Sequence, residues 1–390
     1  MTLKPKDDTT RKHLTILLSA NILAKLFLVL VLATVPVEDV GAFLGISYEY
    51  VSENWRVVGM EYDSRPLVDK LAYTFDSRWF VNIAGEGYVF RREDTPYLKP
   101  NNREMERAPC LYNWLFMYPA FIWTFANLMS VKAAALAVSN LASLAVIVLF
   151  YNIALEWLKP DDAFKATLLM ALFPYNLTVW MTAYSEPLFL LFALISWMSY
   201  KRGRMGLAGV AVMFASFTRF PGMILYPIYT ILYGWKNRRG GSRRLAGGLV
   251  SLNVYAAPIL YWMYVKVPAL TGYALTEITA LCAGYKYVVL GGLVGTGAVA
   301  VLFTYFAFLA GYYLKGVDGE LMLYSLAYLA FHMLVFGTGG SIGRYLGVIW
   351  PLFIYYGRAL DRMDVAFFSS LFMFLAVIMI EFQANMVSWI

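Results

Sequence analysis

The chain has 390 residues, of which 60% are hydrophobic and 15% carry a charged side chain. Soluble domains are nearer half apolar and a quarter charged, and a soluble fold of this size cannot bury so much apolar surface. This composition excludes a cytosolic enzyme, a secreted disulfide scaffold and a disordered chain. The apolar runs are continuous and do not alternate, which also excludes an outer-membrane barrel.

The net charge of +7 comes from short basic clusters between the apolar runs. Such clusters are typical of loops that face anionic lipid headgroups, and no basic, polar-rich domain is present to bind nucleic acid. Cys110 and Cys282 allow at most one disulfide and say little about redox compartment. Two histidines leave no room for a histidine metal cluster.

The first apolar run covers residues 13–35 and follows a polar N-terminal segment. It is too long for a signal-peptide core and lacks a small-residue cleavage site before Pro36, so we expect it to remain as the first transmembrane helix. Lys25 lies in its middle, where a charge is costly in lipid. Two interpretations stay open: snorkelling or a hydrogen bond toward the protein, and a position near the phosphate of an anionic lipid.

The remaining pattern predicts an all-α polytopic membrane protein, a single domain over residues 1–390 with about eleven transmembrane helices. Several predicted spans are shorter than the roughly 20 residues that cross a bilayer, so tilted, broken or re-entrant helices are expected. The candidate spans are 13–35, 132–157, 164–181, 186–200, 206–219, 222–235, 245–265, 287–313, 321–336, 344–359 and 365–388, of which those within 132–388 form a helical bundle.

The lysines and arginines indicate the orientation, because cytoplasmic loops are enriched in them. The basic loops share one side if residues 112–129 do not cross the membrane and lie on or dip into its outer surface. The N-terminus is then cytoplasmic and the C-terminus outside. If 112–129 does cross, the later charge pattern inverts. The residues concerned are Lys4, Lys6, Arg11, Lys12, Lys159, Lys165, Lys201, Arg202, Arg204, Lys236, Arg238, Arg239, Arg243, Arg244, Lys315, Arg358 and Arg362.

Residues 36–111 form the one long polar segment and hold 13 of the 25 acidic residues. We expect residues 36–131 to form an extracytoplasmic loop that carries interfacial helices. A transporter or channel does not need such a loop directly after its first helix, whereas an enzyme that acts on the outer leaflet does. Function also tends to reside in long loops held by a rigid scaffold.

Within this loop, residues 75–88 (FDSRWFVNIAGEGY) predict an amphipathic helix on the membrane surface. The apolar residues at helical spacing are Trp79, Phe80, Ile83 and Ala84, and the expected helix ends are Asp76 and Ser77 at the N-cap and Gly85 and Gly87 at the C-terminus. Asp76 either only caps this helix or, ionised at the helix N-terminus, accepts a proton from a substrate hydroxyl. Asp63-Ser64-Arg65 repeats the tripeptide without the aromatic helix and is interpreted as a turn.

Further outward-facing features carry charge or glycine. Glu186, in YSEP, is either a helix-start acid or a functional carboxylate, since a glutamate at membrane depth is expensive. Arg219, in TRFPG, either snorkels to the interface or binds a ligand. The glycine-rich turn at 337–343, which leads into Arg344, is either a simple connector or a phosphate site made of backbone amides and a guanidinium. His332 and Glu381 are interpreted as packing or paired residues of the bundle.

At this point the chain resembles a known family, the GPI mannosyltransferase II type of the GT-C membrane glycosyltransferases, and is similar to its prokaryotic, archaeal members. The string at 75–88 resembles that family's motif. Further elements follow in the family's order, namely FMYP at 116–119, AYSEPLF at 183–189, KRGR at 201–204 with FTR at 217–219, and RYL at 344–346 with PLF at 351–353. Glu86 stands where the family often has histidine, and residues 89–113 form a longer link than usual.

The resemblance implies a GT-C fold with a catalytic aspartate in a large first outer loop. It also implies a polyprenyl (dolichyl) phosphate mannose donor, inversion at the anomeric carbon to give an α-mannoside, and a lipid or glycolipid acceptor. By position Asp76 is the catalytic base. The residues expected to bind substrate are Arg78, Trp79, Tyr118, Tyr184, Glu186, Arg219, Arg344 and Tyr345. No motif requires a cofactor, although the acidic loop is compatible with a divalent metal, and no obligate protein partner is predicted.

Two alternatives remain beside this function. A lipid or solute transporter or flippase would share the spans, Lys25 and an outward pocket, and it predicts inverted repeats and broken helices in both halves. A GT-C enzyme with another sugar or a protein acceptor would share the aspartate but not the Tyr-Ser-Glu and Arg-Tyr-Leu elements. Aromatic residues such as Trp79, Tyr88 and Tyr118 either stack on sugar faces or form an interfacial belt.

Overall fold

The computed structural model describes residues 8–35, 66–88, 115–238, 242–259, 318–336 and 342–384. These residues form helices joined by loops, and no strand occurs among them. Three of these helices are long and apolar enough to cross a membrane: α1 (Asp8–Thr34), α7 (Val131–Ala154) and α22 (Arg362–Ala384). The protein is therefore a helical membrane protein.

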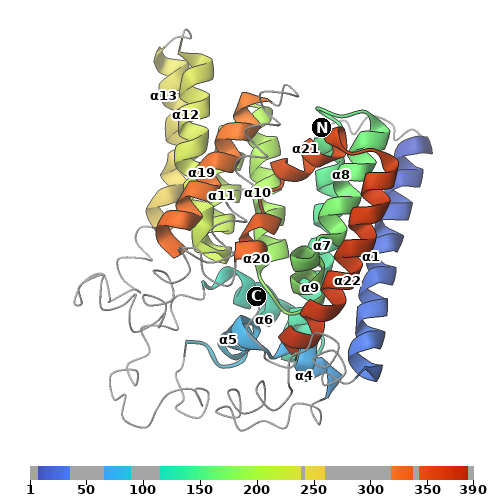
Figure 1. Ribbon diagram of the computed structural model, residues 1–390. Coiled ribbons are helices and arrows are strands. Elements are labelled where there is room, and N and C mark those ends of the chain that lie inside the picture. The colour runs from blue at the N-terminus through green and yellow to red at the C-terminus, as the bar shows by residue number, and fades with distance from the viewer. Residues whose placement is uncertain are drawn as a thin grey trace.

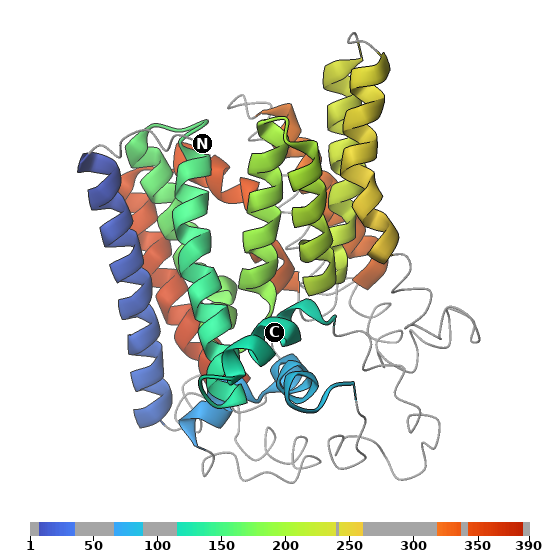
Figure 2. The same cartoon turned by 180° about the vertical axis from the view of Figure 1, so that it is seen from behind.

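The helices stand side by side and mostly run along one common direction (Figures 1 and 2). On one side α1, α7 and α22 pack with α8 (Pro160–Leu172) and α9 (Pro174–Met181). On the other side α10 (Glu186–Lys201) and α11 (Met205–Thr218) pack together, and beyond them lie α12 (Leu225–Asn237), α13 (Ser242–Asn253) and α19 (Gly319–Phe336). Large apolar side chains such as Leu23 and Phe367, 64% and 65% exposed, lie on the outside, where lipid is the matching solvent.

Three short helices lie together at the end of the bundle where α1 finishes (Figures 1 and 2): α4 (Leu67–Ala72), α5 (Phe75–Glu86) and α6 (Met117–Ala126). A helix of the length of α6 rises only about 15 Å, half of the hydrocarbon core of a bilayer. This length agrees with the expectation that residues 112–129 do not cross the membrane.

Most predicted spans coincide with helices, but two of them are broken. The predicted span 164–181 consists of α8 and α9, which are separated at Phe173 before Pro174. The predicted span 344–359 consists of α20 (Ile342–Gly347) and α21 (Pro351–Ala359), and it too breaks before a proline. Proline lacks a backbone N–H and clashes with the preceding turn, so each helix ends there. The span 287–313 lies outside the described residues, as do the last residues of 245–265, so eleven spans remain a prediction.

The sharpest break lies between α9 and α10, whose axes differ by 111°. Residues 182–185 connect them and are fully buried. Buried backbone groups that a break releases must find other partners, because lipid offers none. The partners come from α7: the Ser139 hydroxyl donates to the carbonyls of Val179 and Trp180 at 3.4 and 3.2 Å, and the Asn140 amide donates to that of Met181 at 3.4 Å.

Lys25 belongs to the same polar region. It is buried, and its ammonium donates to Asn140 Oδ1 at 2.9 Å and to Ser143 Oγ at 2.7 Å. Of the two interpretations from the sequence, the structure shows the hydrogen bonds toward the protein. One turn earlier, Asn21 donates to the carbonyl of Ala171 at 3.2 Å, a carbonyl close to the break between α8 and α9. The first helix is thus joined to the broken spans by polar contacts inside an apolar bundle.

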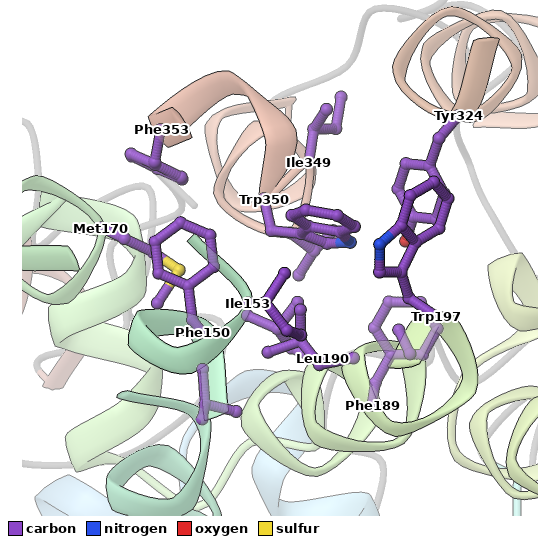
Figure 3. Close-up of a cluster of buried hydrophobic side chains, with 14 of the residues drawn as sticks. Phe150, Ile153, Met170, Phe189, Leu190, Trp197, Tyr324, Ile349, Trp350 and Phe353 are labelled. Atoms are coloured by element: carbon purple, nitrogen blue, oxygen red, sulfur yellow. The ribbon is translucent and has the colours of Figure 1, made fainter. Parts of the chain in front are cut away.

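The largest buried side chains form an aromatic core around Trp197 and Trp350 (Figure 3). Their ring centroids are 5.2 Å apart, and Tyr324 lies 5.8 Å from Trp197 and 5.4 Å from Trp350. Phe150 of α7 contacts Trp350 at 6.3 Å. These rings come from α7, α10, α19 and the start of α21, so the aromatic core connects elements that are far apart in the sequence.

A glycine tests how tightly the turn after α11 is folded. An ideal Cβ added at Gly222, in the 3-10 helix η6 (Phe220–Ile224), would overlap the backbone of Ser216 and lie 2.6 Å from the carbonyl carbon of Ala215. We expect Gly222→Ala to lower the free energy of unfolding by about 1–3 kcal/mol, because backbone atoms cannot move aside cheaply. The midpoint of thermal unfolding in detergent measures this change.

Gly206, near the start of α11, is the matched control, because a Cβ added there would meet no atom within 4 Å. Gly206→Ala should leave the midpoint unchanged or raise it, since alanine is the better helix former by about 1 kcal/mol. Equal losses in both variants would show that the turn at Gly222 is not closely packed.

Candidate functional site

Helix α5, which carries Asp76, begins at Phe75, and Thr74 is its N-cap, two residues before the aspartate. The Ser77 hydroxyl accepts a hydrogen bond from the Thr74 backbone N–H at 2.7 Å and donates to the Thr74 carbonyl. The expectation that Asp76 and Ser77 form the N-cap is therefore wrong by two or three residues. Asp76 lies in the first turn of α5, where the helix dipole still favours a negative charge. Gly87, at a φ of +78°, ends the helix, and Gly85 lies inside it.

The inner face of α5 anchors it to the bundle. Phe80, Val81, Ile83 and Ala84 are buried, and the Phe80 ring meets Tyr118 of α6 edge to face at 5.1 Å. Tyr118 is completely buried, and its hydroxyl donates to the carbonyl of Ala135 in α7 at 2.9 Å. Burial, followed by the negative charge of Glu186, raises the pKa of the Tyr118 hydroxyl well above its ordinary value, so it stays protonated.

Two further contacts hold α4 against the bundle. Lys132, in the first turn of α7, binds Asp69 of α4 at 2.7 Å and lies over the Tyr73 ring. The backbone N–H of Ala183, in the loop of the broken span, donates to the carbonyl of Leu71 at 3.2 Å. Helix α4 is thereby joined directly to the segment that carries Glu186.

Glu186 is the first residue of α10, immediately after the break, and its side chain is only 2% exposed. Two arginines surround its Oε1 atom: Arg219 Nη1 and Arg344 Nε each lie 2.7 Å away. Arg219 also lies 3.3 Å from the Ser185 hydroxyl. A buried carboxylate requires such partners, because an unpaired charge in low dielectric is very costly.

The two arginines reach Glu186 from different elements. Arg219 is the C-terminal cap of α11, in extended conformation before η6. Arg344 lies on α20, whose end is held when Asn176 of α9 donates to the carbonyl of Gly347 at 3.2 Å. The Arg344 guanidinium lies over the Tyr184 ring at 5.3 Å, a favourable cation–π distance.

Asp76 completes this cluster. Its Oδ2 atom lies 3.0 Å from both Nη1 and Nη2 of Arg344, so one guanidinium binds Asp76 by its outer edge and Glu186 by Nε. The Asp76 side chain is 34% exposed, against 7% for Arg344 and 2% for Glu186. The cluster therefore runs from the buried Glu186 carboxylate through the Arg344 guanidinium to the partly exposed Asp76 carboxylate, with Arg219 bound to Glu186.

The structure brings together five of the residues predicted to form the site: Asp76, Tyr184, Glu186, Arg219 and Arg344. Arg78 is buried and lies over the Trp79 ring at 5.2 Å, within the same helix α5. Tyr118 packs against Phe80 and is completely buried, so its ring is not accessible to a sugar in this structure.

Other candidates fall elsewhere. Asp63, the glycine-rich residues 337–341 and the side chains of His332 and Tyr345 lie outside the described residues, and Glu381 is buried in α22. Sequence reasoning missed the asparagines and serines that hold the break, notably Ser139, Asn140 and Asn176. Their signal was available, because an amide or hydroxyl inside an apolar run marks a backbone group that needs a partner.

No group of three or more histidine, cysteine, aspartate or glutamate side chains is placed to hold a metal ion within the described parts of the chain. Comparisons with protein-family models, with curated proteins and with solved structures find no match. The function of this cluster must therefore be argued from its own geometry and chemistry.

Glu186→Gln tests whether the buried carboxylate holds the cluster. The variant leaves two guanidiniums facing a neutral amide, so we expect the free energy of unfolding to fall by about 3 kcal/mol. Chemical or thermal unfolding of purified protein in detergent measures the loss.

Glu320→Gln is the matched control. Glu320 binds Lys201 at 2.8 Å, but both side chains are 22–24% exposed, so its loss should cost less than about 1 kcal/mol. If Glu320→Gln destabilises the protein as much as Glu186→Gln, the special position of Glu186 is contradicted.

Proposed function

We propose that this protein is an inverting membrane glycosyltransferase that moves mannose from polyprenyl (dolichyl) phosphate mannose to a hydroxyl of a lipid-linked acceptor. The observation that carries the proposal is the partly exposed carboxylate of Asp76 held 3.0 Å from a guanidinium at the interfacial end of the bundle. A base and a phosphate-binding cation are the two groups that such a transfer needs in one place.

In the proposed step, the bond between the mannose C1 and the phosphate oxygen breaks, and the phosphate leaves with the electron pair. The acceptor oxygen forms the new bond to C1 from the opposite face, which gives the α-mannoside. The proton of the acceptor hydroxyl goes to the Asp76 carboxylate. The phosphate is a weakly basic leaving group and needs no strong acid, so alignment and charge stabilisation supply most of the catalysis.

Arg344 and Arg219 are the groups that stabilise the leaving phosphate in this proposal. A guanidinium presents parallel N–H donors that match a phosphate, and both side chains lie in a water-poor region where such bonds are strong. Glu186 holds the two guanidiniums in place through contacts of 2.7 Å. The polyprenyl chain would lie among the apolar helices, in contact with the bilayer.

The distribution of charge supports an extracytoplasmic site. Asp76 lies at the end where α1 finishes, and the described basic loops lie at the other end: Lys165 reaches the carbonyl of Leu360, and Arg362 reaches Asp161. Basic loops face the cytoplasm by the positive-inside rule. We therefore assign the N-terminus to the cytoplasm of a prokaryotic cell and the cluster to the outer face of its plasma membrane.

The resemblance of residues 75–88 and the four later elements to GPI mannosyltransferases of the II type supports mannose as the sugar and a GT-C fold with about eleven spans. Four of the residues in these elements, Asp76, Glu186, Arg219 and Arg344, form one contiguous ion-pair cluster. The acceptor is a lipid or glycolipid in this proposal, and Glu86, in place of the family's histidine, belongs to the region that would select it.

Asp76→Asn tests the catalytic assignment. The amide cannot take the proton of the acceptor, so transfer should fall by about 10²–10⁴-fold while expression in the membrane is retained. The assay incubates purified protein with polyprenyl phosphate mannose and a host lipid extract, and mass spectrometry detects the gain of one hexose on a lipid. Transfer at the normal rate in this variant contradicts the assignment.

Asp69→Asn is the matched control, since Asp69 lies in the same layer but binds Lys132 away from the cluster, with 29% of its side chain exposed. Its transfer should stay within about twofold of the original protein, because a partly exposed ion pair contributes little. Asp63→Asn should also retain activity, and an inactive Asp63 variant would move the role of base to that residue.

A transporter or flippase is the second candidate, and the 111° break between α9 and α10 is the observation that favours it. Many transporters bind substrate where broken helices meet. Their fold would place the opposing break in a second, related half of the chain, and the long acidic loop would have no role. The same lipid assay separates the two functions, because transport moves a lipid between leaflets without adding a hexose.

A further inference from the structure

Asp76 and Glu186 bind the same guanidinium, but they bind it in different ways. Oε1 of Glu186 lies 2.7 Å from Nε of Arg344 and also 2.7 Å from Nη1 of Arg219, and the Glu186 side chain is 2% exposed. Oδ2 of Asp76 accepts hydrogen bonds from Nη1 and Nη2, the outer edge of the guanidinium, at 3.0 Å each, and the Asp76 side chain is 34% exposed. The inner carboxylate is therefore fixed, whereas the outer one is accessible to water and can exchange Arg344 for another partner more readily, provided that another anion takes its place on the buried guanidinium.

The outer edge of Arg344 is also the edge that suits a phosphate. Its two terminal nitrogens offer parallel donors, and this is the geometry by which arginine binds phosphate in a bidentate manner. In the structure these nitrogens bind Asp76. A carboxylate and a phosphate cannot both take the same donors, so the two anions compete for one cation.

We infer that Asp76 occupies the phosphate-binding edge of Arg344 in the resting protein, and that the phosphate of a prenyl phosphate ligand displaces it. This inference rests on the proposed function for its choice of ligand, and it adds a regulation of that site. While paired, Oδ2 of Asp76 accepts two N–H bonds at 3.0 Å, so these donors compete with an acceptor hydroxyl for the same oxygen. Arrival of the lipid phosphate frees the base, so the donor itself activates the enzyme.

The balance of charge fits this exchange. The two arginines neutralise the two carboxylates of the resting cluster. A phosphodiester brings one negative charge, which takes the place of Asp76 at Arg344, and Asp76 turns toward water and the acceptor. Glu186 keeps the two guanidiniums in position throughout, since its contacts lie on their inner side.

Mutation of a binding-site residue usually weakens ligand binding, but competition between Asp76 and the phosphate for Arg344 predicts the opposite for Asp76. Asp76→Asn removes the internal competitor, so it should bind a C15 prenyl monophosphate about two- to tenfold more tightly than the original protein. Binding is measured by calorimetry in detergent with purified full-length protein. An unchanged or weaker affinity of Asp76→Asn overturns the inference.

Matched variants separate competition from a general change of charge. Asp69→Asn removes one negative charge from the same layer and should leave the affinity unchanged, whereas a gain equal to that of Asp76→Asn overturns the inference. Arg344→Gln should weaken binding, and adding Asp76→Asn to it should restore nothing. The double variant removes one cation and one anion, so it also keeps the cluster neutral if Arg344→Gln alone fails to fold. A gain from Asp76→Asn in the Arg344→Gln background overturns the inference.

Two further ligands show whether the site binds the phosphate group, the prenyl chain or both. A neutral C15 prenol should show no difference between the original protein and Asp76→Asn, and a gain for the prenol overturns the role of the phosphate. Inorganic phosphate should bind far more weakly than the prenyl phosphate in both proteins. Equal affinity for the two phosphates would assign the edge to a free phosphate and overturn the lipid assignment.

The binding measurements are distinguishable from the test of the proposed function. Loss of transfer in Asp76→Asn with unchanged affinity would remove the exchange and leave the glycosyltransferase proposal standing. Tighter binding with transfer retained would support the exchange and remove Asp76 as the base.

Discussion

The constraint on which the rest of the structure depends is the buried negative charge of Glu186. A carboxylate that is 2% exposed in a lipid-embedded bundle must be paired, because its desolvation costs several kcal/mol. It is paired twice, by arginines that come from the end of α11 and from α20. Three segments that are widely separated in the sequence therefore meet at one atom, and the outer guanidinium edge that remains is the one that holds Asp76.

The position of Glu186 depends in turn on the broken span before it. Bending α9 against α10 by 111° leaves the last carbonyls of α9 without partners in their own helix, and they need other partners inside the bundle. Polar side chains of α7 supply them, and Lys25 of the first helix holds Asn140 in this arrangement. Lys25, Ser139 and Asn140, polar residues of otherwise apolar helices, thus stabilise the sharp break between α9 and α10 inside the bundle.

The two ends of the bundle are held together by different interactions. Toward the basic end, the rings of Trp197, Trp350 and Tyr324 pack together and join their helices (Figure 3), and the Lys201 ammonium lies 5.9 Å from the Trp197 ring centroid. Toward the end where α1 finishes, the ion-pair cluster joins α5, α10, α11 and α20, and its outermost member, Asp76, is 34% exposed. A rigid aromatic core behind a charged cluster suits a site that must hold two guanidiniums steady while one carboxylate exchanges partners.

The amino-acid sequence by itself determined the membrane class and the approximate position of most helices, and it marked Asp76, Glu186, Arg219 and Arg344 as candidates for the site. Apolar runs and charges are local properties, so composition and spacing reveal them directly. The tertiary structure alone decided that these four side chains form one cluster, that Tyr118 is completely buried, and that Thr74 caps α5. It also decided that α8–α9 and α20–α21 break and how their backbone groups are satisfied. Pairings such as Arg344 with Asp76 join residues on separate helices, and their geometry arises only when the buried charges and the freed carbonyls must find partners within one packed bundle.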